Sequence, residues 1–146
     1  MNNTIGLINY GIAGNIHSIK KAIEKEIPIM RVCLRNQIMG LAAGANTYKL
    51  KYGHRSANQP VLDLENKNKC YITSQNHGYA VVAESFPDES MYVTHINMND
   101  NTVEGIKYKN IPLFTVQFHP EASPGPKDNG YLFEEFMTMI TKWKKD

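Results

Sequence analysis

Hydrophobic residues along the chain follow a helical period near the N-terminus and change to short strand-like runs after residue 46. Over residues 15–26, NIHSIKKAIEKE, Asn15 is a candidate N-cap residue. The apolar positions of this segment recur at helical spacing, at Ile16, Ile19 and Ile23. The apolar run TIGLIN at 4–9 predicts a strand, and YGIAGN at 10–15 predicts a glycine-containing turn. A strand, a turn and a helix in this order predict the beginning of a doubly wound α/β sheet.

The hydrophobic pattern predicts two more helices and one buried strand. Residues 27–34, IPIMRVCL, are largely apolar on both faces, which is typical of a buried strand in a parallel sheet. Residues 36–45, NQIMGLAAGA, predict a short helix that ends at Gly44. Residues 131–144, YLFEEFMTMITKWK, predict the last helix. Its apolar face consists of Leu132, Phe133, Phe136, Met139, Ile140 and Trp143.

The segment between residues 47 and 118 consists of short β-favouring runs separated by Gly, Pro, Asn and Asp clusters. These runs predict strands at 47–53, 60–64, 69–74, 79–85, 91–99, 102–108 and 112–118. The sequence NDNTVEGIKY predicts a hairpin with its turn near Asp100 and Asn101. We place His54 in a loop, His77 in a polar turn and His95 in a strand, and His17 on a helix surface.

Composition narrows the class of protein. The chain has 146 residues, 42% of them hydrophobic and 21% charged, so we expect one globular domain over 1–146. The net charge is +2, and the basic KWKKD at the end suits a solvated helix terminus, so no nucleic-acid partner is expected. No apolar run approaches the roughly 20 residues of a membrane span, and no signal-peptide pattern opens the chain. We expect a soluble cytoplasmic protein that makes no membrane contact.

Two cysteines are too few for a disulfide framework and too far apart for a metal knuckle. Cys70 alternates with Ile72 on a predicted strand, and we interpret it as structural. No pair of histidines has metal-ligand spacing with a convincing third ligand, so we predict no metal site. The glycine-containing GIAGN is too short for a nucleotide-binding fingerprint.

Cys33 lies where the predicted buried strand passes into a helix, and a helix N-terminus lowers the pKa of a thiol. Cysteine catalysis also needs a base and a group that orients the base. His119 follows an apolar strand, and Glu121 is two residues further on, so these two could supply both roles. Because 119 − 33 = 86 residues separate His119 from Cys33, only the fold can bring them together. A buried small residue at Cys33 and a strand-end histidine capped by its neighbours are the alternative.

Four segments carry a resemblance to a known family: residues 28–61, 71–81, 93–106 and 114–128. They resemble the class I glutamine amidotransferase domain of the carbamoyl-phosphate synthetase small chain, from about Pro28 to Ile140. HPEASPGP together with SQNHG is specific to that subfamily, whereas the opening INYGIAGNIHSIKKAI also resembles the glutaminase subunit of imidazole-glycerol-phosphate synthase. The resemblance implies an α/β, flavodoxin-like open sheet with flanking helices, here without some central elements.

The resemblance also implies a chemistry. Cys33 would attack the side-chain amide of glutamine, giving a glutamyl thioester and ammonia, with His119 as base and Glu121 as its orienting group. The glutamine contacts would be Leu34, Gln37, Asn76, Gly78 and Tyr79. Ammonia would pass to a large synthetase subunit that makes carbamoyl phosphate, for pyrimidine and arginine biosynthesis, from bicarbonate and ATP. ATP would belong to that partner, so no cofactor is expected for this chain.

The sequence departs from the family in three places. Arg31 and Arg35 replace both glycines of the G-x-C-x-G elbow, and a side chain forced into such a turn costs about 1–3 kcal/mol. A segment that supplies one oxyanion N–H is missing before Ile27, and such a loss typically lowers the rate about 10²–10³-fold. From the early position of the first predicted strand, we also expect this chain to lack the family's N-terminal domain, which helps to dock the partner. Three readings stay open: an impaired glutaminase, a catalytically inactive binding or scaffold protein (a remnant or an engineered deletion), and a fragment that is not stably folded.

Overall fold

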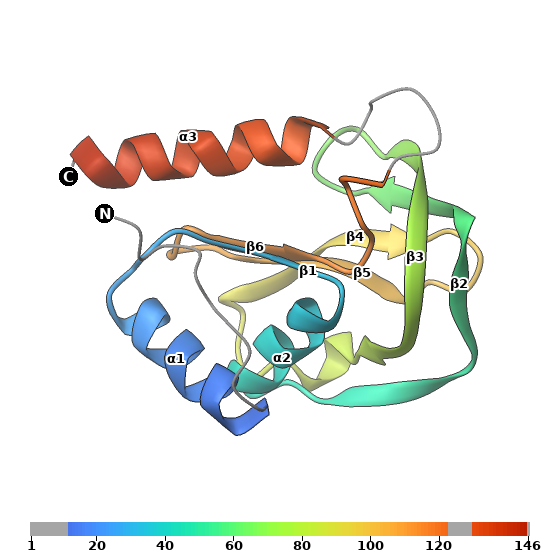
Figure 1. Ribbon diagram of the computed structural model, residues 1–146, viewed down its shortest axis with the longest axis horizontal. Helices are drawn as coiled ribbons and strands as arrows, with labels where there is room; N and C mark the ends of the chain where they lie inside the picture. Colours follow the sequence, from blue (N-terminus) through green and yellow to red (C-terminus); the bar gives the residue numbers. More distant parts are fainter. Residues whose placement is uncertain (1–11, 123–129, 146) are drawn as a thin grey trace.

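One curled sheet of six strands organises the computed structural model, which describes residues 12–122 and 130–145 (Figure 1). The strand order is β1-β6-β5-β4-β2-β3. The strands are β1 (Ile29–Val32), β2 (Thr47–Asp63), β3 (Lys69–Val81), β4 (Met91–Asn97), β5 (Val103–Tyr108) and β6 (Leu113–Val116). The helices are α1 (Ile12–Glu24), α2 (Leu34–Ala42), the short 3-10 helix η1 (Ala83–Ser85) and α3 (Tyr131–Lys145).

Helices α1 and α2 cover one face of the sheet, and α3 covers the other (Figure 1). The alternation of β6 explains this arrangement, because its four residues are all buried but face two different layers. Leu113 packs with α1 and α2, whereas Phe114 and Val116 pack against α3. The predicted α/β architecture with flanking helices is therefore confirmed. The sheet is mixed rather than mostly parallel, since β1 and β6 are the one parallel pair among the described strands.

The helix predictions are confirmed with two corrections. α2 begins at Leu34, two residues earlier than predicted, and Gly44 follows its C-terminus with a φ of 94°. α1 begins at Ile12, so the predicted turn is helical from that residue onward and Asn15 lies inside the helix rather than at its N-cap. The predicted strand at 4–9 lies outside the described residues. None of the helices in the two described ranges is long and apolar enough to cross a membrane.

The largest correction concerns the region of β2 and β3, where four short strands were predicted and two long ones are present. β2 has 17 residues and β3 has 13, and they pair with register shifts near Gly53 and near Ser56. These irregularities absorb the glycine and polar residues that predict turns, because a bulge accommodates an extra residue without ending the strand. The predicted β4–β5 hairpin is confirmed, with Asn101 at a φ of 59° in its turn.

Several side chains lie elsewhere than expected as a result. His54 is inside β2 and His77 inside β3, both buried, rather than in a loop and a turn. Cys70 is on a strand as predicted but is exposed, so it is not part of a core. Phe133 of α3 is 44% exposed because it faces an open cavity instead of close-packed residues. His95 in β4 and His17 on the exposed surface of α1 are where the sequence predicts them.

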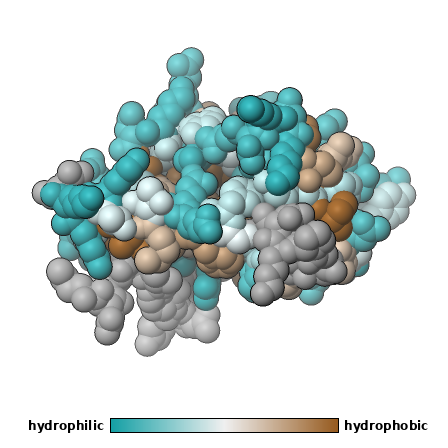
Figure 2. Space-filling model, turned by 90° about the horizontal axis from the view of Figure 1, so that it is seen from above, coloured by the Kyte–Doolittle hydropathy of each residue, from teal (hydrophilic) through white to brown (hydrophobic). Residues whose placement is uncertain are grey.

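The molecular surface is mainly hydrophilic in the view from above, with smaller hydrophobic areas between the polar side chains (Figure 2). Exposed apolar side chains of α3 include Phe133 and Met137. Single exposed apolar residues of this kind are common in folded proteins.

Candidate active site

Cys33 occupies the sharp turn between β1 and α2. Its backbone has φ 55° and ψ −118°, a conformation that a residue with a side chain rarely adopts. The Cys33 N–H donates to the Val116 carbonyl at 3.0 Å, and its own carbonyl accepts from the Asn36 N–H at 2.9 Å. A strained strand-to-helix turn that presents a nucleophile at a sheet edge is the geometry of a nucleophile elbow. The structure therefore gives Cys33 the backbone setting that the sequence predicts.

The thiol of Cys33 is half-buried, and its Sγ lies 3.7 Å from the Asn76 carbonyl oxygen. Burial raises the pKa of this thiol, and the nearby Glu121 carboxylate raises it further. The Leu34 backbone N–H and the Gln117 side chain act in the opposite direction by stabilising the thiolate. Because the net effect is a raised pKa, the thiol needs a base to become a nucleophile.

His119 and Glu121 form an ion-pair geometry on the loop after β6, with His119 Nδ1 2.8 Å from Glu121 Oε1. β1 and β6 are parallel and pair Val32 with Val116, so the residues that follow both strands lie at the same edge of the sheet. The His119 N–H also donates to the Ser74 carbonyl of β3 at 2.9 Å, which fixes the loop. Among the described residues, no hydrogen bond joins Cys33 Sγ to the His119 ring.

The predicted glutamine contacts lie on α2 and β3, on either side of Cys33. Gln37 is buried, and its Nε2 donates to the Tyr79 carbonyl at 2.8 Å, which links the two elements. The Leu34 and Tyr79 side chains are 60% and 48% exposed, so both are open to a ligand. Asn76 is exposed and Gly78 is half-buried in the same part of β3. The structure thus gathers these residues near the thiol.

Sequence reasoning missed a buried polar group beneath this site. Gln117 Oε1 accepts from Asn36 Nδ2 and from Gln37 Nε2, both at 3.1 Å. Thr115 Oγ1 in turn donates to Asn36 Oδ1 at 2.5 Å. Gln117 Nε2 is buried and has no hydrogen-bond partner among the described residues, although it lies beside the thiol that it influences. Gln117 is the one amide residue in the strand-like run FTVQF, but no local pattern in the sequence predicts its partners Asn36 and Gln37.

The two arginines that flank Cys33 take different positions. Neither Arg31 nor Arg35 has a positive φ, so the strained conformation of the turn falls on Cys33 itself. Arg35 is exposed on the first turn of α2. Arg31 is 5% exposed, and its Nε is buried without a hydrogen-bond partner among the described residues. Burial lowers the pKa of the Arg31 guanidinium, and the charge of Arg35 lowers it further.

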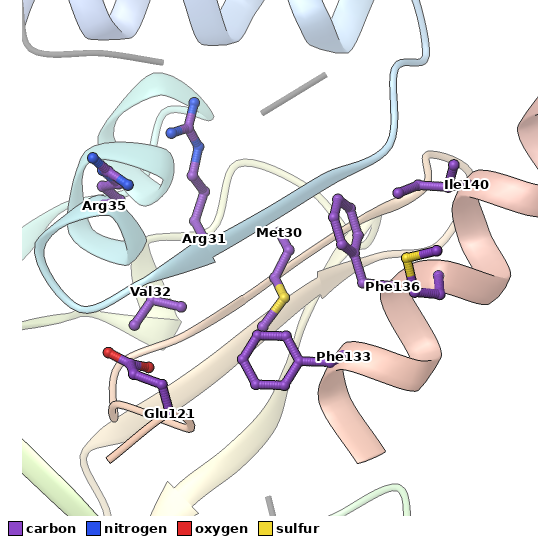
Figure 3. Close-up of a pocket in the computed structure, with 9 residues that line it drawn as sticks. Met30, Arg31, Val32, Arg35, Glu121, Phe133, Phe136 and Ile140 are labelled. Carbon is purple, nitrogen blue, oxygen red and sulfur yellow. The ribbon is translucent and has the colours of Figure 1, made fainter. Parts of the chain in front are cut away.

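An open cavity of about 550 Å³ separates β1 from α3 (Figure 3). Met30 and Val32 point toward it, whereas the Arg31 side chain rises from the other side of β1. The lining is mainly apolar: Met30, Val32, Phe133, Phe136, Met137 and Ile140, with Arg31, Arg35 and Glu121 at its margin. Because glutamine is polar at both ends, this cavity suits it less well than the α2 and β3 side of Cys33 does.

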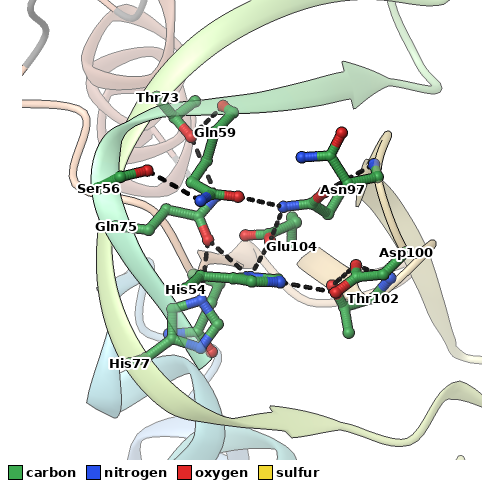
Figure 4. A network of polar contacts seen from close by, with 12 residues as sticks. His54, Ser56, Gln59, Thr73, Gln75, His77, Asn97, Asp100, Thr102 and Glu104 are labelled. Carbon is green, nitrogen blue, oxygen red and sulfur yellow. Dashed lines mark hydrogen bonds and ion pairs between the residues drawn. The ribbon is translucent and has the colours of Figure 1, made fainter. Parts of the chain in front are cut away.

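A second polar site is present at the junction of β2, β3 and β5, and we call His54, His77 and Glu104 the histidine cluster (Figure 4). The sequence predicts no metal site, yet each of these three residues offers a ligand atom, and all three atoms lie within 4.8 Å of one another. The Glu104 hydrogen bond raises the pKa of His54 to about 9. Burial lowers the pKa of His77 to about 4, so this ring is neutral at pH 7.

Comparison with known proteins gives the family. The family model for glutamine amidotransferase class-I matches residues 6–139, and the chain belongs to this family. It is similar to curated carbamoyl phosphate synthase small chains. The small chain of Clostridium acetobutylicum is 55% identical over 124 residues, which are 85% of this chain and 35% of that one. The small chain of Bacillus cereus is 52% identical over 131 residues, or 90% and 35% of the two chains. This chain therefore spans about one third of the length of these relatives.

Solved structures support the same fold. A crystal structure of a glutamine amidotransferase from Thermotoga maritima has a TM-score of 0.65 at 20% identity, covering 98% of this chain and 66% of that one. The glutaminase domain of Trypanosoma brucei CTPS, solved with bound acivicin, has a TM-score of 0.70 at 16% identity, covering 94% and 69%. The class I glutamine amidotransferase architecture is thus present in this chain despite its short sheet.

Proposed function

We propose that this chain hydrolyses the side-chain amide of L-glutamine through Cys33 and releases ammonia for carbamoyl phosphate synthesis. The observation that carries the proposal is the strained backbone of Cys33 at the same sheet edge as the His119–Glu121 pair. A residue keeps such a conformation only where the surrounding structure enforces it, and such positions cluster at active sites. The family membership of the chain supports the same chemistry.

In this mechanism His119 takes the proton of the Cys33 thiol, and Glu121 stabilises and orients the imidazolium that results. The thiolate attacks the amide carbon, ammonia leaves with a proton from His119, and water then cleaves the thioester to glutamate. The Leu34 N–H would stabilise the oxyanion, and its favourable interaction with the Cys33 thiolate, which lowers the pKa of the thiol, supports this role. Gln37, Asn76, Gly78 and Tyr79 would hold the amino-acid end of glutamine.

We further propose that a large synthetase subunit receives the ammonia, as the similarity to carbamoyl phosphate synthase small chains suggests. That partner, rather than this chain, would then bind bicarbonate and ATP. A cytoplasmic location fits the two free thiols, since reducing compartments keep cysteines unpaired.

A catalytically inactive amidotransferase-like binding or scaffold protein is the second candidate. The observation that favours it is the raised pKa of the Cys33 thiol beside the two arginines that replace glycine. Such a protein would bind glutamine without hydrolysing it.

Ammonia release from glutamine by the purified protein distinguishes the two candidates. We expect slow turnover by the wild type, the same turnover by the control variant Cys70→Ala, which changes an exposed thiol, and none by Cys33→Ala. Turnover that persists in Cys33→Ala would exclude the proposed nucleophile. Calorimetric binding of glutamine without turnover by the wild type would establish the binding protein instead.

A further inference from the structure

The histidine cluster lies outside the proposed catalytic residues and has the composition of a metal site. Its three side chains come from β2, β3 and β5, and His54, His77 and Glu104 are 6%, 7% and 0% exposed. His54 and His77 are directly paired across β2 and β3, with ring centroids 4.9 Å apart and nearly perpendicular planes. Two imidazoles and a carboxylate are a common ligand set for zinc.

Both histidine rings are held by their outer nitrogen and leave the inner one facing the cluster (Figure 4). His54 Nε2 lies 2.7 Å from Asp100 Oδ2, and His77 Nδ1 donates to the Tyr79 carbonyl at 2.8 Å. This leaves His54 Nδ1 and His77 Nε2 as the ligand atoms. Metal-binding histidines almost always donate their second N–H to a carboxylate or a backbone carbonyl in this way.

The centre of the cluster contains more hydrogen-bond acceptors than donors. His77 Nε2 and His54 Nδ1 lie 2.8 Å and 3.1 Å from the same atom, Gln75 Oε1, and His77 Nδ1 lies 2.8 Å from the Tyr79 carbonyl oxygen. Turning the Gln75 amide would put its oxygen against Thr73 Oγ1, whose proton is already donated to the Gln59 carbonyl. Gln75 Oε1 therefore faces the cluster, where two ring nitrogens and the Glu104 carboxyl group meet at one buried place, as the ligands of a cation do.

Glu104 adds a buried carboxyl oxygen without a hydrogen-bond partner to the same cluster. Its Oε1 lies 3.2 Å from Asn97 Nδ2 and 3.3 Å from His54 Nδ1. Its Oε2 is buried and has no hydrogen-bond partner among the described residues. Buried carboxylate oxygens are normally satisfied, because leaving one without a partner costs about 1–3 kcal/mol or more.

We propose that the histidine cluster binds one Zn²⁺ ion through His54 Nδ1, His77 Nε2 and a carboxylate oxygen of Glu104, with Gln75 Oε1 or water as the fourth ligand. Tetrahedral zinc with bonds of about 2.1 Å separates its ligand atoms by about 3.4 Å. The 3.3 Å between His54 Nδ1 and Glu104 Oε1 already matches this spacing, and because all three ligand atoms lie within 4.8 Å of one another, no other pair needs to approach by more than about 1.4 Å. Binding releases the proton that His54 Nδ1 otherwise holds.

The ion would link strands β2, β3 and β5 to one another. It would also restrict the motion of the part of β3 that lies near Cys33. Tyr79 O accepts both from His77 and from Gln37 of α2, so a fixed His77 ring also fixes this part of β3. The zinc site does not depend on glutamine hydrolysis, and it can be tested with a protein that has no activity.

The test uses a chelator-treated Cys33→Ser Cys70→Ser protein, because thiols would bind zinc on their own account. We expect one equivalent of Zn²⁺ by calorimetry, a higher midpoint of thermal unfolding, and intense visible bands of four-coordinate cobalt on titration with Co²⁺. Glu104→Gln, which keeps the shape of the side chain, should abolish binding. Asp100→Asn, which alters the group that orients His54, should weaken it about 10–100-fold.

The control variants are His17→Gln, which changes an exposed histidine, and His119→Gln, which removes an imidazole–carboxylate pair outside the histidine cluster. Both should bind zinc as tightly as the parent. Zinc binding that is absent from the folded parent, or that survives in Glu104→Gln, would overturn the proposal. If Glu104→Gln does not fold, the cobalt spectrum of the parent protein tests the proposal instead. Weak bands of six-coordinate cobalt in that spectrum would also overturn the proposal.

Discussion

Cys33 concentrates backbone strain and chemical reactivity in a single residue. Its φ of 55° would be easy for glycine, and its neighbours Arg31 and Arg35 have ordinary φ values. The family's elbow glycines are therefore not needed here for backbone conformation. What Arg31 adds beside this turn is a buried guanidinium whose Nε has no hydrogen-bond partner among the described residues.

The strain at Cys33 predicts an unusual order of stability among variants. Cys33→Gly should be more stable than Cys33→Ala by about 1 kcal/mol, because glycine adopts this conformation without the penalty that a Cβ atom brings. Urea unfolding of the two variants measures the difference in free energy of unfolding. Equal stability of the two variants, or a less stable Cys33→Gly, would mean that the turn is relaxed.

At the residue scale, the sequence identifies residues with a distinctive chemistry, such as a cysteine or a histidine beside a carboxylate. It does not identify polar residues whose partners come together only through the fold. Cys33, His119 and Glu121 can be selected from residue type and position, and the structure puts them at one sheet edge. Gln117 and the histidine cluster could not be found in this way. The partners of these residues are distant in the sequence, as His54 and Glu104 are from each other. Strand pairing, which no local sequence pattern specifies, brings them together.

At the scale of elements, helices were easier to predict than the long strands. The apolar stripe of α3 predicts where this helix begins and ends, because the helical period can be read from the segment itself without knowledge of its partners. β2 and β3 were divided in the prediction because Gly53 and several polar residues interrupt them. Their continuity comes from mutual pairing, which tolerates bulges.

The end of β2 is anchored by a buried carboxylate, Asp63, which is 2% exposed. Its Oδ2 lies 3.6 Å from His95 Nε2, and its Oδ1 accepts from the Glu65 N–H at 2.9 Å. Burial alone would raise the pKa of this carboxyl, but the His95 imidazole and the Glu65 N–H outweigh that effect and lower it. A carboxyl with a lowered pKa stabilises the fold above its ordinary pKa, and this contribution is lost as the pH falls through the folded-state value.

Asp63→Asn should therefore destabilise the protein by about 1 kcal/mol at neutral pH, since it removes a charge-assisted interaction. The difference from wild type should shrink as the pH falls below the ordinary carboxyl pKa of 3.8. Urea unfolding at a series of pH values measures it, with Glu89→Gln as an exposed control that should change nothing. A difference that is independent of pH would rule out the ionised Asp63 as its source.

At the scale of the whole molecule, the chain keeps the part of the family fold that carries the elbow and the His119 loop. β1 is an edge strand among the described strands, and a cavity of about 550 Å³ lies between it and α3. The sequence predicts missing central elements from the short connection before Ile27, and this stays a prediction; among the described strands, β1 and β6 are the one parallel pair. That residues 1–146 form a single domain stays a prediction.

The central claim is that Cys33 is a nucleophile in a glutamine pocket. Intact-mass analysis after exposure to a glutamine-mimicking diazo-ketone tests it most directly, with Cys33→Ala as control. We predict one covalent adduct on the wild type, none on Cys33→Ala, and protection by excess glutamine. A wild-type protein that is folded by circular dichroism but forms no adduct, or whose adduct glutamine does not block, would contradict the account.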